Sequence, residues 1–145
     1  MPLEPTKLKP QRDRVRVVSL DADVSDHDSA VERVSAMAVR VECAYVCFGT
    51  VHMVMESHDS PEFGAKVNDA DMIVTDGMPL VWMQRWLGRK TAARVRANDL
   101  MMLLIAHAER SGLRVGFYGG KQQVVDAMVE RAKKEQPALD LAYAF

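Results

Sequence analysis

The sequence lacks the features that mark membrane-spanning, secreted and nucleic-acid-binding proteins. Its 145 residues contain no run of about 18 apolar residues, which a transmembrane helix needs, and residues 1–16 contain no apolar stretch typical of a secretory signal. Two cysteines are too few for a disulfide framework, so Cys43 and Cys47 are expected to be reduced and mostly buried. Nineteen basic and twenty acidic residues give a net charge of −1, whereas nucleic-acid binding usually requires a basic excess. An ordinary globular protein remains, for which a cytoplasmic location is the default expectation.

Strand-like and helix-like segments alternate along the chain. This alternation predicts an α/β fold, a Rossmann-like three-layer sandwich with a mainly parallel sheet. The segments expected to be strands are 14–20, 42–48, 71–75, 113–118 and 139–145. The segments expected to be helices are 25–40, 51–57, 59–69, 79–87, 98–110 and 121–135. Ser25 is expected to cap the first helix and Asn98 or Asp99 the fifth, and the polar residues 21–28 are expected to form a turn.

The chain is expected to hold one domain. Residues 1–13, which include three prolines, are expected to be a flexible leader, and residues 14–145 a single unit. Residues 139–145 resemble a strand in the middle of a fold, so we expect the domain to be incomplete at its C-terminus. An exposed strand edge there predicts marginal stability or homo-oligomerisation through that edge.

Asp76 is the first candidate for chemistry. In open parallel sheets, ligands bind beyond the carboxyl ends of the strands, and Asp76 follows such an end and precedes Gly77. A carboxylate there can act as a general base, a role worth about 10²–10⁴-fold in rate. An Asp-Gly pair is also common in plain turns, and the pattern alone leaves both interpretations open.

Other groups at strand ends are weaker candidates. Gly119 and Gly120 either bring backbone N–H groups to a phosphate or form only a tight turn. Both interpretations stay open because the complete dinucleotide and Walker patterns are absent. A basic stretch fits either a diphosphate site or a solvated loop; its members are Arg85, Arg89, Lys90, Arg94 and Arg96. His52 follows a strand end and is a candidate ligand contact. None of the four histidines has metal-ligand spacing, so no metal site is expected.

The order and spacing of five motifs point to one family. The motifs are VHMVME at 51–56, PEF at 61–63, ADMIVTDGMP at 70–79, RVRANDL at 94–100 and VGFYGG at 115–120. Together they resemble the WecG/TagA/CpsF family of bacterial glycosyltransferases, and the resemblance extends over about residues 14–145.

The resemblance implies a reaction and a set of site residues. It implies transfer of N-acetylmannosamine or a related sugar from a UDP-sugar to an undecaprenyl-diphosphate-linked acceptor, at the cytoplasmic face of the plasma membrane. It also implies inversion, no metal ion or other cofactor, and products that enter teichoic acid, enterobacterial common antigen or exopolysaccharide. Asp76 matches the catalytic base, which deprotonates the acceptor hydroxyl. The nucleotide-sugar pocket implied by the resemblance includes Arg94, Asp99, Gly119 and Gly120. The neighbouring strand ends add three expected substrate-binding residues, namely Thr50, His52 and Gly77.

The sequence departs from the family pattern in three places. Phe48 stands where the family often has Thr, and Thr50 where it has Asn, although a Thr hydroxyl can still donate a hydrogen bond. Ala97 stands where Gly is usual. The family also continues through a Pro-Lys-Gln-Glu motif and a membrane-directed tail. We therefore expect weak or no catalysis by this chain alone, with a non-catalytic nucleotide-sugar-binding remnant and a generic dinucleotide binder as alternatives.

Overall fold

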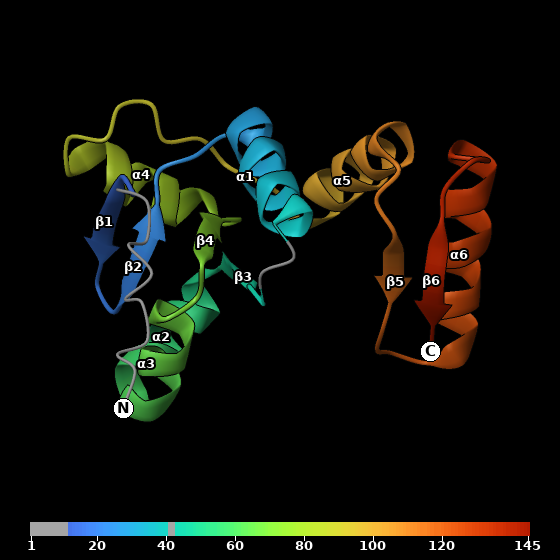
Figure 1. Ribbon diagram of the computed structural model, residues 1–145. Coiled ribbons are helices and arrows are strands. Elements are labelled where there is room, and N and C mark those ends of the chain that lie inside the picture. Colours follow the sequence, from blue (N-terminus) through green and yellow to red (C-terminus); the bar gives the residue numbers. More distant parts are fainter. Residues whose placement is uncertain (1–11, 41–42) are drawn as a thin grey trace, which may run out of the picture.

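The computed structural model describes residues 12–40 and 43–145, which contain six helices and six strands (Figure 1). The strands are β1 (Arg14–Val17), β2 (Leu20–Asp23), β3 (Val46–Gly49), β4 (Met72–Thr75), β5 (Val115–Phe117) and β6 (Leu141–Ala144). The helices are α1 (His27–Val39), α2 (Val51–Asp59), α3 (Pro61–Asn68), α4 (Met78–Trp86), α5 (Ala97–Ser111) and α6 (Gln122–Glu135). The expected α/β class is confirmed. Residues 1–11 of the expected leader lie outside the described residues.

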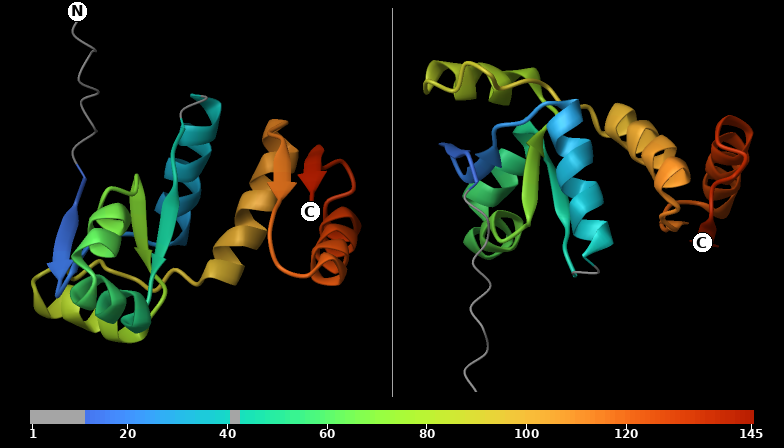
Figure 2. Two further views of the ribbon diagram at one scale, coloured as in Figure 1. Left: turned by 90° about the horizontal axis from the view of Figure 1, so that it is seen from below. Right: turned by 45° about the horizontal axis from the view of Figure 1, so that its top comes forward.

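The described strands form three two-stranded sheets and not one continuous sheet. β1 and β2 pair antiparallel, whereas β3 pairs with β4 and β5 with β6 in parallel. The parallel pairs agree with the expected βαβ units, but the single mainly parallel sheet of a Rossmann-like sandwich is not seen. In Figure 2 the β5–β6 pair and α6 stand apart from β3 and β4, with α5 leading from one group to the other.

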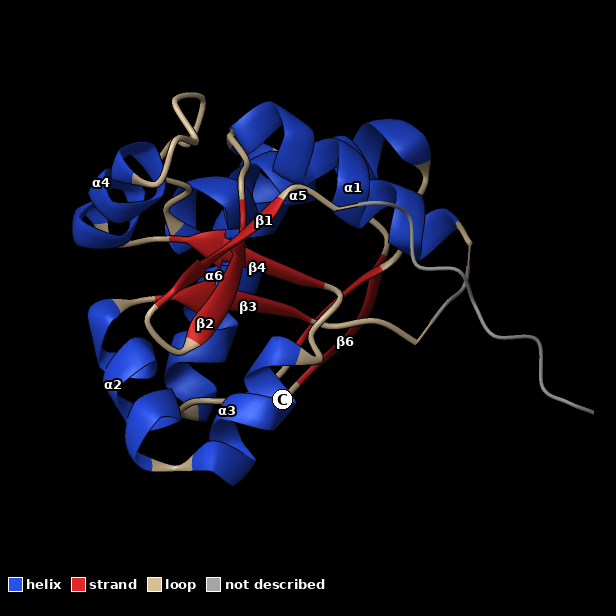
Figure 3. Cartoon of the chain, turned by 90° about the vertical axis from the view of Figure 1, so that its left-hand side faces the viewer, coloured by secondary structure: helices blue, strands red, loops and turns tan. Residues whose placement is uncertain are grey.

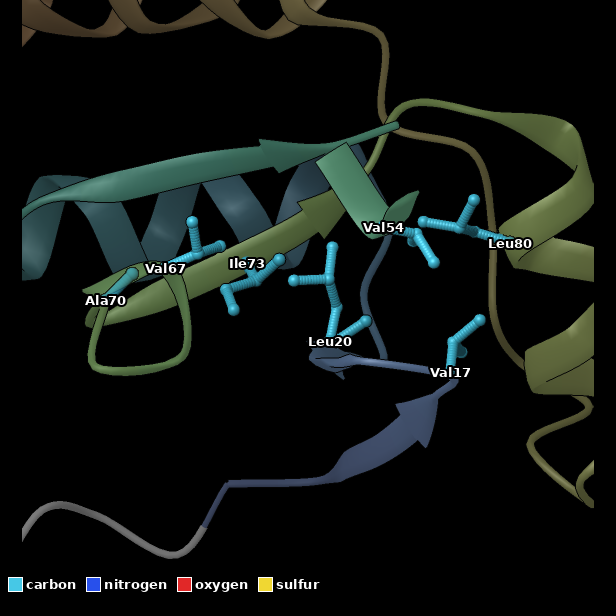
Figure 4. Packing of buried hydrophobic residues seen from close by; sticks show 8 residues of the cluster. Val17, Leu20, Val54, Val67, Ala70, Ile73 and Leu80 are labelled. Atoms are coloured by element: carbon cyan, nitrogen blue, oxygen red, sulfur yellow. The ribbon is translucent and has the colours of Figure 1, made fainter. Parts of the chain in front are cut away.

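β4 lies at the centre of the larger group, and both of its faces are covered. Alternate residues of a strand point to opposite faces. Ile73 packs with residues of β1, β2, α2, α3 and α4 (Figure 4), whereas Met72 and Val74 pack with residues of α1 and α5. Figure 3 shows α2 and α3 on one side of the strands and α1 and α5 on the other. This double burial fixes the position at which β4 ends.

The expected turn at 21–28 is wrong in its first part, because Leu20–Asp23 form β2. Asp23 gave this segment the polar composition of a turn, yet its side chain is fully buried. Its carboxylate accepts hydrogen bonds from Arg14 at 3.1 Å, from Arg33 at 2.9 Å and from the backbone N–H of Ile73 at 2.8 Å. An Asp with such partners is compatible with a buried strand, since its charge is compensated.

The first helix begins at a different cap from the one expected. Asp26, not Ser25, is the N-cap of α1, and its side chain accepts from the backbone N–H of Ser29 at 2.8 Å. This hydrogen bond lowers the pKa of the Asp26 carboxyl. The Ser29 hydroxyl accepts in return from the Asp26 backbone N–H at 3.0 Å. The two reciprocal bonds form a capping box one residue later than predicted.

The start of α5 also differs from the expectation. The helix begins at Ala97 and its N-cap, Arg96, makes no side-chain cap. Asn98 and Asp99 lie inside the first turn, so neither is the cap. The backbone N–H of Ala97 is bound from outside the helix, by the carboxylate of Asp76 at 3.3 Å. α5 ends at Ser111, one residue after the expected end, and Gly112 caps it in the left-handed conformation with φ 66°.

The two cysteines are free thiols. Cys47 packs partly buried against the core, and this burial raises the pKa of its thiol. Cys43 is exposed, contrary to the expectation for this residue, because it precedes β3 and packs against no core cluster of the described residues.

Gly64 is required by the close packing of α3 on α2. A Cβ at this position would lie 2.8 Å from the backbone carbonyl oxygen of Ser57. We expect Gly64→Val to lower the free energy of unfolding by about 1–3 kcal/mol, because the backbone of α2 must move away, even though Val favours a helix more than Gly does. Urea unfolding measures the loss. Ala65→Val, at the exposed neighbouring position, is the matched control and should cost less than about 0.7 kcal/mol; equal losses in the two variants would contradict the packing argument.

Candidate active site

Asp76 follows β4 directly, at the carboxyl end of the β3–β4 pair. Its backbone N–H donates to the carbonyl of Gly49 at 3.0 Å, which extends the pairing beyond the strands. Its Oδ2 accepts from the backbone N–H of Ala97, and its Oδ1 from Nη2 of Arg94, each at 3.3 Å. The Asp76 side chain is 22% exposed. The carboxylate is therefore held on two sides and still open to a ligand.

Arg94 is held against Asp76 by the chain segment that connects α4 to α5. The backbone N–H of Val95 donates to the Thr75 carbonyl at 2.8 Å, and that of Ala93 to the Ser25 carbonyl at 3.2 Å. Nε of Arg94 donates to the backbone carbonyl of Asp76, in addition to the contact between the two side chains. The Arg94 side chain is 43% exposed, so its guanidinium is available to an anion as well.

A buried polar network supports the last residue of β4. Thr75 and Gln84 are fully buried. The Thr75 hydroxyl lies 3.4 Å from Oε1 of Gln84 and 3.3 Å from the carbonyl of Ala93, and donates to one of them at a time. Nε2 of Gln84 donates to the backbone carbonyl of Asp23 at 3.2 Å. Sequence reasoning missed Gln84, although its place on the buried side of α4, with Leu80 and Val81, is the signal that finds it.

The end of β3 brings Thr50 close to the site, but Thr50 already has a role in the fold. Its hydroxyl caps α2 by accepting from the backbone N–H of Met53 at 3.2 Å. Gly77, the N-cap of α4, lies beside the first turn of α2: a Cβ on it would be 4.0 Å from the backbone nitrogen of Val51. The N-termini of α2 and α4 therefore meet next to Asp76. His52 lies on the exposed side of α2, where its ring is 3.4 Å from Glu56, so the described contacts do not bring it to Asp76.

The two glycines predicted to bind phosphate lie in the turn between β5 and α6. Gly119 and Gly120 have φ values of 103° and 84°, a conformation that favours glycine. The backbone N–H of Gly119 donates to the carbonyl of Phe145 at 2.9 Å. Asp99, in the first turn of α5, lies 3.8 Å from Arg96.

A cavity of about 480 Å³ is lined both by this turn and by the first turn of α5. Its lining at one end includes Ala97, whose N–H binds Asp76, and at the other end Gly119 and Tyr118. Phe48 of β3 and apolar side chains of α5, β5 and α6 form the walls. The volume falls in the range of about 300–1,000 Å³ that is typical of small-molecule sites. Gly119 therefore lines the cavity directly, whereas Asp76 adjoins it through its bond to the N–H of Ala97.

Two other members of the basic stretch have partners away from Asp76. Arg85 donates to the carbonyl of Ala92 at 2.9 Å, and Arg89 lies 2.9 Å from Asp13. Among the five residues of this stretch, the described contacts bring only Arg94 to Asp76. Within residues 12–40 and 43–145, no three His, Cys, Asp or Glu side chains come together in a way that could hold a metal ion.

The arrangement supports proton transfer next to an anion-binding surface. A carboxylate can take a proton from a hydroxyl group. A guanidinium and the N-termini of helices can stabilise negative charge on a leaving group. Asp76, Arg94 and the first turns of α2, α4 and α5 bring these groups together beside the cavity.

Comparison with known proteins identifies a family and two relatives. Residues 15–145 match the glycosyl transferase WecG/TagA/CpsF family. An N-acetylglucosaminyldiphosphoundecaprenol N-acetyl-beta-D-mannosaminyltransferase of Bacillus spizizenii is 27% identical over 99 residues, which cover 68% of this chain and 38% of the relative. A protein of the same name from Bacillus subtilis is 25% identical over 76 residues, which cover 52% of this chain and 30% of the relative. The aligned part of the chain thus spans less than half of each relative.

Across the described residues, every helix is too short or too polar to serve as a membrane span. The family match extends over nearly all of the described residues and includes Asp76, Arg94 and the glycines of the β5–α6 turn. The chain therefore belongs to the WecG/TagA/CpsF family of glycosyl transferases.

Proposed function

We propose that the chain transfers N-acetylmannosamine, or a related sugar, from a UDP-sugar to an undecaprenyl-diphosphate-linked acceptor. The observation that carries this proposal is the Asp76 carboxylate, held by Arg94 and by the N–H of Ala97 at the edge of a cavity. Family membership supports glycosyl transfer. The names of the two relatives support the sugar and the lipid-linked N-acetylglucosamine acceptor.

In the proposed reaction Asp76 is the general base. The acceptor hydroxyl gives its proton to the Asp76 carboxylate, and its oxygen forms a bond to the anomeric carbon of the donor sugar. The bond between that carbon and the diphosphate oxygen breaks, and its electron pair leaves with UDP. Attack from the face opposite the leaving group inverts the anomeric carbon. The proton on Asp76 then passes to water.

Arg94 and the helix N-termini serve the leaving group in this proposal. Negative charge grows on the UDP diphosphate as the bond breaks, and a guanidinium binds a diphosphate oxygen pair well. Arg94 is tethered to Asp76 and half-exposed, so it can hold the diphosphate close to the base. The first turns of α2 and α4 add their partial positive charge.

The cavity beside Asp76 is the proposed donor site. The nucleotide lies toward the turn of Gly119 and Gly120. The N–H of Gly119 already donates to the Phe145 carbonyl, so the proposed phosphate contacts are Gly120 and the N-terminus of α6, whose N-cap makes no side-chain cap. Phe48 and Tyr118 offer aromatic surface for the uracil ring of the nucleotide. Thr50, His52, Gly77, Asp99 and Gly120 are proposed substrate contacts outside the cavity lining. No metal ion takes part in the proposed step.

The lipid-linked acceptor implies a location at the membrane surface. We infer that the chain acts peripherally at the cytoplasmic face of the plasma membrane, where an undecaprenyl-linked sugar is anchored by its lipid. The product would enter teichoic acid or another cell-surface polysaccharide. The undecaprenol in the names of the relatives supports this inference.

UDP release and UDP binding together test the proposed function. We expect the chain to bind UDP in calorimetry, and to release UDP from UDP-N-acetylmannosamine slowly and only when a short-chain prenyl-diphosphate-linked N-acetylglucosamine is present. UDP binding without turnover would instead favour the non-catalytic nucleotide-sugar-binding role. Absence of both UDP binding and turnover would contradict the transferase role and the nucleotide-sugar-binding role alike. NAD binding in a fluorescence titration would favour a generic dinucleotide binder.

A further inference from the structure

The outer side of α4 presents a large apolar surface to solvent. Trp82 and Trp86, the two tryptophans of the chain, lie one turn apart and are 60% and 79% exposed. Met83 and Leu87 beside them are also exposed. The opposite side of α4 packs against the core, and the helix lies at the outer edge of the fold (Figure 2). We call Trp82, Met83, Trp86 and Leu87 the α4 outer face.

Basic side chains border the α4 outer face. They are Arg85, Arg89 and Lys90, all exposed, and they form what we call the basic rim. Residues 77–98 contain no Asp or Glu. Arg89 pairs with Asp13 at 2.9 Å, whereas Arg85 donates to a neutral backbone carbonyl. Three cations against one carboxylate leave the rim positive, although the whole chain has a net charge of −1.

We propose that the α4 outer face and the basic rim dock on an anionic lipid bilayer, with Trp82 and Trp86 in the interfacial layer. Tryptophan is enriched at the membrane–water interface because its ring is apolar and its N–H is polar. A helix with an apolar face containing Trp and Leu, bordered by basic residues, is typical of interfacial binding. Anionic headgroups complement the charge of the rim.

A second copy of the chain is a poorer occupant of this surface. In a two-fold symmetric dimer the same patch faces itself. The basic rim would then meet the basic rim, and like charges that face each other oppose association. Anionic lipid replaces this repulsion with attraction and still buries the two indole rings.

The docked orientation connects the surface to the site, a step that rests on the proposed function. α4 begins two residues after Asp76, and Trp82 lies about 6 Å further along the helix axis at 1.5 Å per residue. A lipid-linked acceptor has its diphosphate in the headgroup layer. Docking through α4 would therefore hold Asp76 close to the layer in which the acceptor hydroxyl lies.

Vesicle binding tests the docking surface without any donor or acceptor. We expect the wild-type chain to co-sediment with vesicles of phosphatidylglycerol and phosphatidylcholine, with a blue shift of tryptophan emission, and to bind pure phosphatidylcholine more weakly. Trp82→Ser with Trp86→Ser should weaken co-sedimentation about tenfold or more. Lys90→Gln should weaken it only on the anionic vesicles. Leu103→Ser with Val124→Ser, which removes two exposed apolar side chains of α5 and α6, is the matched control and should bind as the wild type does.

Several outcomes would overturn the docking proposal. They are an unshifted wild-type emission with no co-sedimentation, equal weakening by the double tryptophan variant and by the control, and a dimer that the tryptophan variant abolishes. Circular dichroism checks that each variant is folded. If a variant is unfolded, the shift of the wild-type tryptophan emission still tests the docking proposal. Transfer to a water-soluble acceptor separates the two proposals: transfer without docking overturns only the docking surface, and docking without transfer overturns only the proposed function.

Discussion

Asp76→Asn is expected to reduce sugar transfer by about 10²–10⁴-fold and to leave UDP binding intact. Asparagine has nearly the same shape, and its side-chain oxygen can still accept from the N–H of Ala97 at the start of α5. The amide cannot take the proton from the acceptor hydroxyl. The proposed base is therefore removed while the local fold is kept. Acceptor-dependent UDP release measures the first effect and calorimetry with UDP the second.

A second carboxylate shows whether the effect belongs to the site. Asp59 lies at the end of α2 with a side chain that is 75% exposed, and it contacts only the neighbouring His58 in the described hydrogen bonds and ion pairs. Asp59→Asn should transfer sugar at the wild-type rate. Wild-type turnover in Asp76→Asn would show that another group is the base. Loss of UDP binding together with turnover would make Asp76 a donor-binding residue.

Local signals in the sequence predict most of the elements. Pro61 at the first position of α3 and Gly112 after α5 mark helix ends by their backbone preferences, and each end lies within two residues of the expected one. The position of Asp76 follows from the same kind of signal, a buried apolar strand followed by Asp-Gly. Such signals depend on a few neighbouring residues, so one sequence suffices to find them.

Long-range contacts account for what the sequence did not predict. β2 was hidden because Asp23 is polar, and only its contacts with α1, β1 and β4 explain its burial. The start of α5 was misplaced because its first N–H is bound by Asp76, 21 residues earlier in the chain. Strand pairing was not predictable either. The alternation of strands and helices does not specify that β5 pairs with β6 and stands apart from β3. Each of these features depends on a partner distant in the sequence.

Asp23→Ala is expected to lower the free energy of unfolding by about 3–5 kcal/mol, the largest stability effect that we predict. The buried carboxylate forms ion pairs with both Arg14 and Arg33, whose side chains are only 20% and 31% exposed. Arg12 is close by, and its pKa is lowered by burial and by the charge of Arg14. Removal of Asp23 would leave Arg14 and Arg33 without their carboxylate partner. It would also leave the backbone N–H of Ile73 without its acceptor inside the core.

The same strand provides the matched control. Asp21 also pairs with an arginine, Arg16 at 3.0 Å, but both side chains are exposed, so Asp21→Ala should cost no more than about 1 kcal/mol. Because domains are stable by only about 5–15 kcal/mol, Asp23→Asn provides a milder second variant, expected to lose about 1–3 kcal/mol. Urea unfolding of the three variants measures the differences, and equal losses at 21 and 23 would contradict the role of burial. The Asp23 carboxylate also ties β2 to β4 through the backbone N–H of Ile73, and Gln84, which contacts Thr75 next to Asp76, binds the backbone carbonyl of Asp23. A shift of β2 after loss of the carboxylate bond would therefore move the acceptor of Gln84 and loosen the site. Turnover per folded molecule should therefore fall in Asp23→Asn and stay unchanged in Asp21→Ala.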